Sequence, residues 1–143
     1  MLLLPTQEVA LQQENRRHLL RALRKPGIHF ITVRYAASCS RQALCRIQAQ
    51  PKQAVACLVI TPVIQCWAVK RRKSPTAPAT ASCLMTLEAA LQAFTLHWVS
   101  LRHGRWNHDE GGSGELTIDV ATGHFTLTHE TFFIERFHYQ LTE

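Results

Sequence analysis

The apolar residues between Thr86 and Gly104 follow the period of an α-helix. They fall on one stripe of a helix with about 3.6 residues per turn, and they are Leu87, Ala90, Leu91, Phe94, Trp98 and Leu101. Thr86 is suited to cap the N-terminus, because its hydroxyl can accept a hydrogen bond from a free N–H of the first turn. Gly104 is suited to end the helix in a left-handed conformation. We therefore expect a helix between these two residues that buries its apolar stripe.

A second helix is predicted over residues 6–23, with Thr6 as its N-cap and Lys25-Pro26-Gly27 beyond its end. The residues expected to face the core are Val9, Leu19, Leu20 and Leu23. Arginines recur on the outer face at i, i+4 and i+7, namely Arg17, Arg21 and Arg24. This ridge is either a binding surface for phosphates or carboxylates of a partner, or an ordinary solvated helix face.

Alternation of polar and apolar residues predicts β-strands on both sides of the central helix. Before it, strands are expected over residues 28–35, 43–50 and 54–69, the last either kinked at Pro62 or broken there into two. After it, they are expected over 115–120, 124–130 and 136–141, with a turn at 121–123. The first strand is apolar on both sides, which indicates a central position in the sheet. The order α-β-β-β-α-β-β-β predicts an α+β fold with a five- or six-stranded, mostly antiparallel sheet and two helices on one face.

Residues 70–83 are predicted to form a flexible loop within a single domain that spans residues 1–143. The segment opens with four cations, Lys70, Arg71, Arg72 and Lys73, and continues with prolines and small residues that bury little surface. Four adjacent cations can contact nucleic-acid phosphates without sequence preference. The same run can also be the solvated end of a strand.

The segment 105–114 is polar and rich in glycine. His108, Asp109 and Glu110, close to His103, are side chains that bind metals or act as general bases, but their spacing matches no zinc-binding or hydrolytic motif. The glycines enter a strand, whereas a phosphate-binding loop enters a helix. A polar connector is therefore favoured over a catalytic site. Trp106 beside Arg105 is either an exposed contact for a partner or packs beneath the loop. His129, on the apolar side of its strand, is expected to bond a neighbour at the edge of the core.

Several of these segments resemble a known family. They are Gly104-Arg105-Trp106-Asn107, the run from Gly111 to Val120, and Phe125-Thr126-Leu127-Thr128-His129-Glu130. Together they resemble the bacterial domain-of-unknown-function family 6878 over residues 84–141, with a weaker similarity at 27–33. The family usually continues with Gly-Asp-Ser-Gly-Gln after its first strand, where this chain has Ala36-Ala37-Ser38-Cys39-Ser40-Arg41-Gln42. The resemblance implies a fold and a setting on plasmids, phages and integrative elements, and it implies no activity.

Five cysteines, at 39, 45, 57, 66 and 83, form no Cys-x-x-Cys pair. We expect reduced thiols in a cytoplasmic protein, with neither a metal nor a cofactor. The longest apolar run, residues 54–69, contains Pro62 and Gln65 and is typical of strands, so no membrane partner is expected.

Charge is distributed unevenly along the chain. Residues 1–76 hold 13 Lys and Arg against 2 acids, or +11, whereas residues 77–143 hold 3 against 8, or −5. Our leading hypothesis is a small non-enzymatic interaction protein from a mobile element that binds a host or defence complex, as anti-CRISPR and anti-restriction inhibitors do. Its expected partner-binding residues are Arg17, Arg21, Arg24, Lys70, Arg71, Arg72, Lys73, Arg105 and Trp106. The alternative is a nucleic-acid-binding accessory protein that uses the basic half, with weak, non-specific binding. An enzyme with a His/Asp loop site ranks third.

Overall fold

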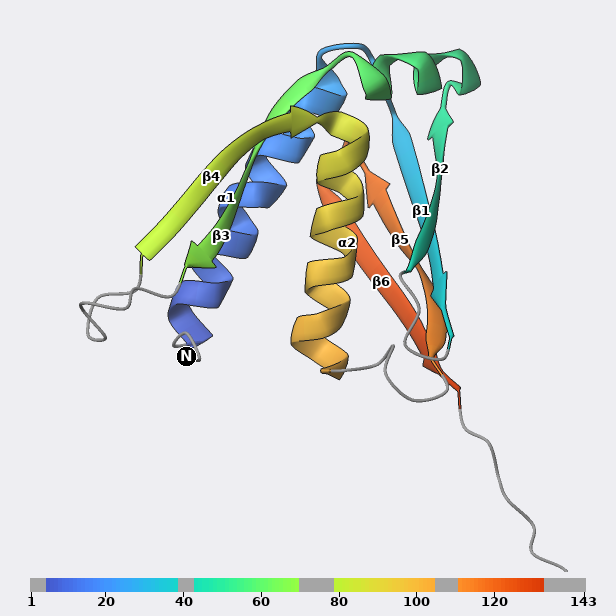
Figure 1. Ribbon diagram of the computed structural model, residues 1–143. Coiled ribbons are helices and arrows are strands. Elements are labelled where there is room, and N and C mark those ends of the chain that lie inside the picture. Colours follow the sequence, from blue (N-terminus) through green and yellow to red (C-terminus); the bar gives the residue numbers. More distant parts are fainter. Residues whose placement is uncertain (1–4, 39–42, 70–78, 105–110, 133–143) are drawn as a thin grey trace, which may run out of the picture.

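The computed structural model describes residues 5–38, 43–69, 79–104 and 111–132 (Figure 1). In chain order its elements are α1 (Pro5–Arg24), β1 (Phe30–Ala37), β2 (Leu44–Gln50), the 3-10 helix η1 (Lys52–Val59), β3 (Pro62–Val69), β4 (Ala79–Thr86), α2 (Leu87–His103), β5 (Gly112–Asp119) and β6 (His124–Thr131). The predicted α+β class is confirmed. The strand expected over residues 136–141 lies outside the described residues.

The described strands form two sheets. Four of them form an antiparallel sheet in the order β2-β1-β5-β6, so β1 is central, as its apolar faces predicted. The other two, β3 and β4, form a separate antiparallel hairpin in which Ile64 lies opposite Leu84. The prediction of one five- or six-stranded sheet is therefore wrong in this respect. The 3-10 helix η1 connects β2 of the larger sheet to β3 of the hairpin, and the hairpin lies beside the helices (Figure 1).

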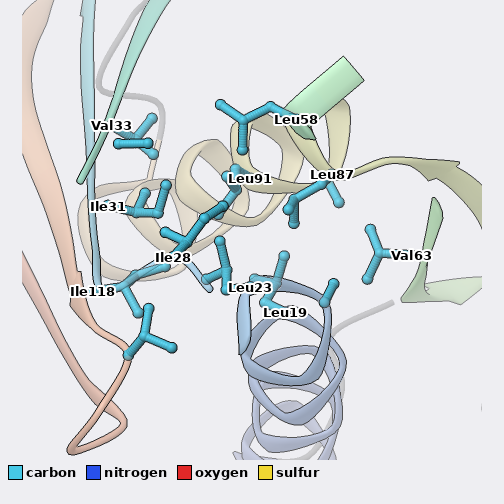
Figure 2. Close-up of a cluster of buried hydrophobic side chains, with 14 of the residues drawn as sticks. Leu19, Leu23, Ile28, Ile31, Val33, Leu58, Val63, Leu87, Leu91 and Ile118 are labelled. Atoms are coloured by element: carbon cyan, nitrogen blue, oxygen red, sulfur yellow. The ribbon is translucent and has the colours of Figure 1, made fainter. Parts of the chain in front are cut away.

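Both helices contribute to one hydrophobic core on the inner side of the larger sheet. Figure 2 shows Leu19 and Leu23 of α1 and Leu91 of α2 close to Ile31 and Ile118 of that sheet. These five side chains have no exposed surface. Fully burying a side chain of this size stabilises the fold by roughly 1.5–3 kcal/mol, so the core fixes both helices to the sheet.

Helix α2 has the ends predicted from the sequence. The Thr86 hydroxyl accepts a hydrogen bond of 3.1 Å from the Ala89 N–H, and the helix ends before Gly104. Gly104 has a positive φ of 58°, but its ψ of −128° differs from the expected left-handed helical conformation. The predicted stripe is correct as far as Phe94, continues in part through Trp98 and fails at Leu101. Leu101 is 43% exposed and Val99 is fully buried, because the C-terminal turns of α2 pack against Tyr35 through Val99. Trp98 is only partly buried, and the Arg16 guanidinium lies 4.7 Å from the centre of its ring.

Helix α1 begins at Pro5, so Thr6 lies inside it instead of capping it. Leu19 and Leu23 are buried as predicted, and Leu20 is partly buried. Val9 is 54% exposed, contrary to the prediction. The residue before it, Glu8, approaches α2 instead, with its carboxylate 3.8 Å from His97 Nε2.

Three further expectations for strands and loops are corrected. Residues 54–59, expected in a strand, belong to η1, since their run of apolar residues has no period that separates strand from helix. Residues 79–83, expected in a flexible loop, belong to β4, and residues 70–78 lie outside the described residues. Strand β5 begins at Gly112, so Gly112 and Gly114 of the expected connector are strand residues. The predicted turn at 121–123 is present, with Gly123 at a φ of 74°.

Candidate interaction groove

Side chains of α1 form hydrogen bonds with the backbone along the outer edge of β3. Asn15 is 2% exposed, its Nδ2 donates to the Cys66 carbonyl at 2.9 Å, and its Oδ1 accepts from the Cys66 N–H at 2.8 Å. One turn further along α1, His18 Nδ1 lies 3.0 Å from the Ile64 carbonyl, as a donor to it. These bonds satisfy backbone groups of β3 that β4 does not pair, so α1 lies alongside the hairpin.

Beside this contact a groove of about 650 Å³ lies between the C-terminal half of α1 and the hairpin. Apolar residues supply its floor and one wall, namely Ala22, Pro62, Val63, Ile64 and Leu84. Ile64 and Leu84 are a direct cross-strand pair, and they are 44% and 67% exposed. The remaining lining residues are His18, Arg21, Arg24, Lys25 and Thr61. The groove therefore combines exposed apolar side chains with a cationic rim.

The cations of this rim differ in how far they are already paired. The Arg24 guanidinium donates to the Val120 carbonyl at 3.3 Å, which ties it to the end of β5. Within the described part of the chain, the side chains of Arg21 and Lys25 make no hydrogen bond or ion pair. Both residues are exposed. Two positive charges therefore face solvent beside Ile64 and Leu84.

The described residues that line the groove include no carboxylate and no thiol. Its cations and apolar side chains can bind an acidic, partly apolar ligand. Across residues 5–38, 43–69, 79–104 and 111–132, no group of three or more His, Cys, Asp or Glu side chains is placed to hold a metal ion.

A second cluster joins β1, β6 and the end of α2. The Tyr35 hydroxyl lies 2.7 Å from His129 Nδ1, and His129 Nε2 lies 3.0 Å from the Thr131 hydroxyl. The His129 ring also stacks on His103, with 4.2 Å between ring centres. Burial raises the pKa of Tyr35, while burial and then the neighbouring His103 lower the pKa of His129. The expectation that His129 bonds a neighbour at the edge of the core is confirmed.

Close packing of β1 against β5 places the Tyr35 side chain in this cluster. Gly114 lies directly opposite Tyr35, and a Cβ built on Gly114 would lie 2.2 Å from the Tyr35 hydroxyl. Only a residue without a side chain fits there. The cluster links β1 and β6 to the end of α2.

The family described as "Family of unknown function (DUF6878)" matches residues 11–142. The chain belongs to this family. The match extends well beyond the resemblance at residues 84–141, and it includes most of α1 and all of the β3–β4 hairpin. Both walls of the groove are thus part of the DUF6878 region. No curated protein and no solved structure matches the chain.

The structure brings together part of the predicted binding set. Arg21 and Arg24 line the groove, whereas Arg17 lies outside it and pairs with Glu14. Lys70–Lys73, Arg105 and Trp106 lie outside the described residues, as do His108, Asp109 and Glu110. The four cysteines within the described ranges, Cys45, Cys57, Cys66 and Cys83, are free thiols. None of the helices described is long and apolar enough to cross a bilayer.

Four residues at this site were not predicted from the sequence, namely Asn15, His18, Ile64 and Leu84. Asn15 and Cys66 are 51 positions apart, and no periodicity links them. Leu84 directly follows the loop predicted over residues 70–83, whose residues are mostly small or charged. The available signal was the strand expected around Ile64, because side chains at alternate positions of a strand lie on opposite faces.

Proposed function

We propose that this DUF6878 chain is a non-enzymatic interaction protein that binds a partner protein through the groove between α1 and the β3–β4 hairpin. The observation that carries the proposal is the exposed pair Ile64 and Leu84 beside Arg21 and Lys25, two cations without a partner among the described residues. Exposed apolar patches rimmed by polar residues are typical of protein-binding sites. Arginine is also enriched at such interfaces.

The free energy available from burying the exposed apolar side chains favours a protein partner. Burying a leucine or isoleucine completely is worth roughly 1.5–3 kcal/mol, and about half of that remains available at Ile64 and Leu84. The two side chains together could therefore contribute roughly 2 kcal/mol on docking. Arg21 and Lys25 would speed and orient the encounter with an acidic surface more than they would add to affinity.

We infer the cellular setting of the protein from the family resemblance and from its thiols. We propose a cytoplasmic protein of a mobile element whose partner belongs to a host or defence complex, as for anti-CRISPR and anti-restriction inhibitors. Free thiols at the described cysteines accord with a reducing compartment.

Nucleic-acid binding is the second candidate, and the cluster of Arg21, Arg24 and Lys25 at the end of α1 favours it. Phosphates would pair with these cations without sequence preference. They would leave Ile64 and Leu84 exposed, however, since aliphatic side chains neither stack on bases nor bond to phosphates. The composition of the groove therefore ranks this candidate below a protein partner.

Photo-crosslinking tests the proposal. A photoreactive amino acid replaces Leu84 in one variant and Leu44 in a matched control, because Leu44 is an exposed leucine on β2, at 78%, away from the groove. In lysate of a bacterium that carries the gene, the Leu84 variant should form a discrete protein adduct that survives nuclease, and the Leu44 variant should not. The adduct protein, once purified, should bind the wild type about tenfold more tightly than Leu84→Ser.

Two results would overturn the proposal. One is an adduct that disappears with nuclease and reappears with added DNA or RNA. The other is equal crosslinking from Leu84 and Leu44, which would show that the groove has no preferred partner.

A further inference from the structure

We infer that the occupant of the groove is an amphipathic helix of the partner protein that carries acidic residues along its flank. This inference rests on the proposed function and specifies the partner's form. Three features of the groove lead to it: the bonded backbone edge of β3 that faces α1, the spacing of the apolar side chains, and the position of two cations without a partner among the described residues.

On the side of the groove where β3 faces α1, the backbone has few groups left for an incoming strand. On the edge of β3 that faces α1, the Cys66 N–H and carbonyl bond to Asn15 and the Ile64 carbonyl bonds to His18. Just before β3, the Thr61 carbonyl accepts from the Leu87 N–H at 2.8 Å. An extended peptide in the groove would leave its own N–H and C=O groups unpaired against apolar side chains, which is costly. A helix satisfies these groups internally.

The apolar floor has the spacing that a helix presents. Pro62 and Ile64 lie on one face of β3, about 6.6 Å apart along the strand, and Leu84 lies across from Ile64. Residues three or four apart on a helix present their side chains about 5–6 Å apart. Apolar residues at i, i+3 or i+4, and i+7 of an incoming helix could therefore contact this floor. A groove of about 650 Å³ is large enough for such anchor side chains.

The cations are arranged for acidic residues on one flank of that helix. Arg21 lies in the last turn of α1, and Lys25 is the first residue after the helix. The Lys25 N–H still donates to the Arg21 carbonyl at 3.3 Å, so the two residues are about one helical turn apart. Neither has a partner within the described residues, and both border the groove. Carboxylates one helical turn apart on the incoming helix would lie opposite them, whereas lysines there would be repelled.

A peptide display experiment tests the inference without knowledge of the partner. Random peptides about 16 residues long, or roughly four helical turns, are selected on the full wild-type chain and depleted on its Leu84→Asp variant. Leu84 is 67% exposed, so this variant should fold, and its melting temperature checks that it does. The enriched peptides should carry leucine-like residues with helical spacing and Glu or Asp on one flank.

The best peptide is then synthesised and its dissociation constant measured by fluorescence anisotropy. A central proline should weaken binding about tenfold or more, because it breaks a helix. Double reversal of Arg21→Glu and Lys25→Glu should weaken it about tenfold, while the matched control Arg17→Glu should change it less than about twofold, since Arg17 lies outside the groove. Enriched peptides that alternate with a period of two, or that tolerate the proline, would overturn the helix.

The outcomes separate this inference from the proposed function. Alternating peptides that still require Leu84 would overturn the helix and leave the groove as a protein-binding site. Failure to enrich any Leu84-dependent peptide would overturn the inference, and failure of the Leu84 crosslink as well would overturn the proposed function. A duplex oligonucleotide that binds equally to wild type and Leu84→Asp would support the nucleic-acid candidate.

Discussion

At the scale of single residues, Asn15 joins two parts of the molecule that are distant in sequence. Its buried amide makes both a donor and an acceptor bond to the backbone of Cys66. Thr95 is buried too, but its hydroxyl donates at 2.7 Å to the Leu91 carbonyl of its own helix. Both polar residues are buried. Loss of Asn15 would leave two backbone groups of β3 without a partner, whereas loss of the Thr95 hydroxyl would leave the Leu91 carbonyl with its helical hydrogen bond.

Replacement of Asn15 by leucine, which has a similar shape, should lower the free energy of unfolding by about 2–4 kcal/mol, because the Cys66 N–H and carbonyl each lose a partner. The control Thr95→Val should cost less than about 1 kcal/mol, since the Leu91 carbonyl keeps its helical hydrogen bond. Urea denaturation followed by circular dichroism measures both. Equal losses would show that the Asn15 bonds contribute little.

A second residue-scale prediction concerns His129. Its pKa in the folded chain is lowered by burial and by His103, from an ordinary value near 6.5. The unfolded chain therefore binds a proton at higher pH than the folded chain does. This contribution to stability is fully present above about pH 6.5 and is lost as the pH falls through the lower, folded pKa. Between about pH 7.5 and pH 5, the melting temperature of the wild type should fall by more than that of His129→Gln. An identical decrease in both would contradict the prediction.

At the scale of elements, helix α2 starts and ends where the sequence predicts, but different residues are buried near its C-terminus than the sequence predicts. Leu91 has no exposed surface, whereas Leu101, one of the residues predicted to be buried beside it, is 43% exposed. Leu91→Asp should cost on the order of 4 kcal/mol, because a carboxylate would be buried without a partner. That is most of the stability of many small domains. Leu101→Asp should melt within a few degrees of the wild type. A folded Leu91→Asp protein with a wild-type midpoint would place the buried face elsewhere.

The elements that sequence reasoning found are those with local causes. The Thr86 cap, the Gly104 end and the central position of β1 all follow from neighbouring residues or from a short period. Element β4 was missed because Ala79-Thr80-Ala81-Ser82 is small and polar, and its strand character depends on pairing with β3. The 3-10 helix η1 was missed because an apolar run of this length fits strand and helix alike.

The candidate groove could be predicted only in part for the same reason. Spacing along α1 identified Arg21 and Arg24, since a helix face can be read from one segment. The opposite wall comes from β3 and β4, which are joined to α1 by Asn15 and His18 across the sequence. A surface assembled from distant segments has no local pattern, so its apolar half became visible only in the fold.

At the scale of the whole molecule, the hairpin is attached differently from the larger sheet. Strand β1 is hydrogen-bonded on both sides, to β2 and β5. The β3–β4 hairpin forms its own sheet, and an isolated two-stranded hairpin is marginally stable, so its stability depends on α1 and α2. The molecule should therefore open in stages.

Native-state hydrogen exchange tests this order. The amides of Ile31 and Val33 in β1 should exchange only through global unfolding, whereas those of β4 should exchange at a lower free energy of opening. The Asn15→Leu variant should lower the opening free energy of the hairpin more than that of β1. Equal protection of β1 and β4 would mean that the two sheets unfold as a single unit.

The contact between Gly114 and Tyr35 also constrains how this family can diverge. A Cβ at position 114 would collide with the Tyr35 hydroxyl and with the Thr128 carbonyl, each at 2.2 Å. A smaller residue at position 35 would remove only the first of these collisions, because the Thr128 carbonyl belongs to the backbone of β6. Homologues that keep this arrangement of β1, β5 and β6 should therefore keep glycine at position 114, whereas the residue at position 35 can become smaller without a collision. An alignment of the family in which alanine or serine is common at position 114 would contradict this expectation.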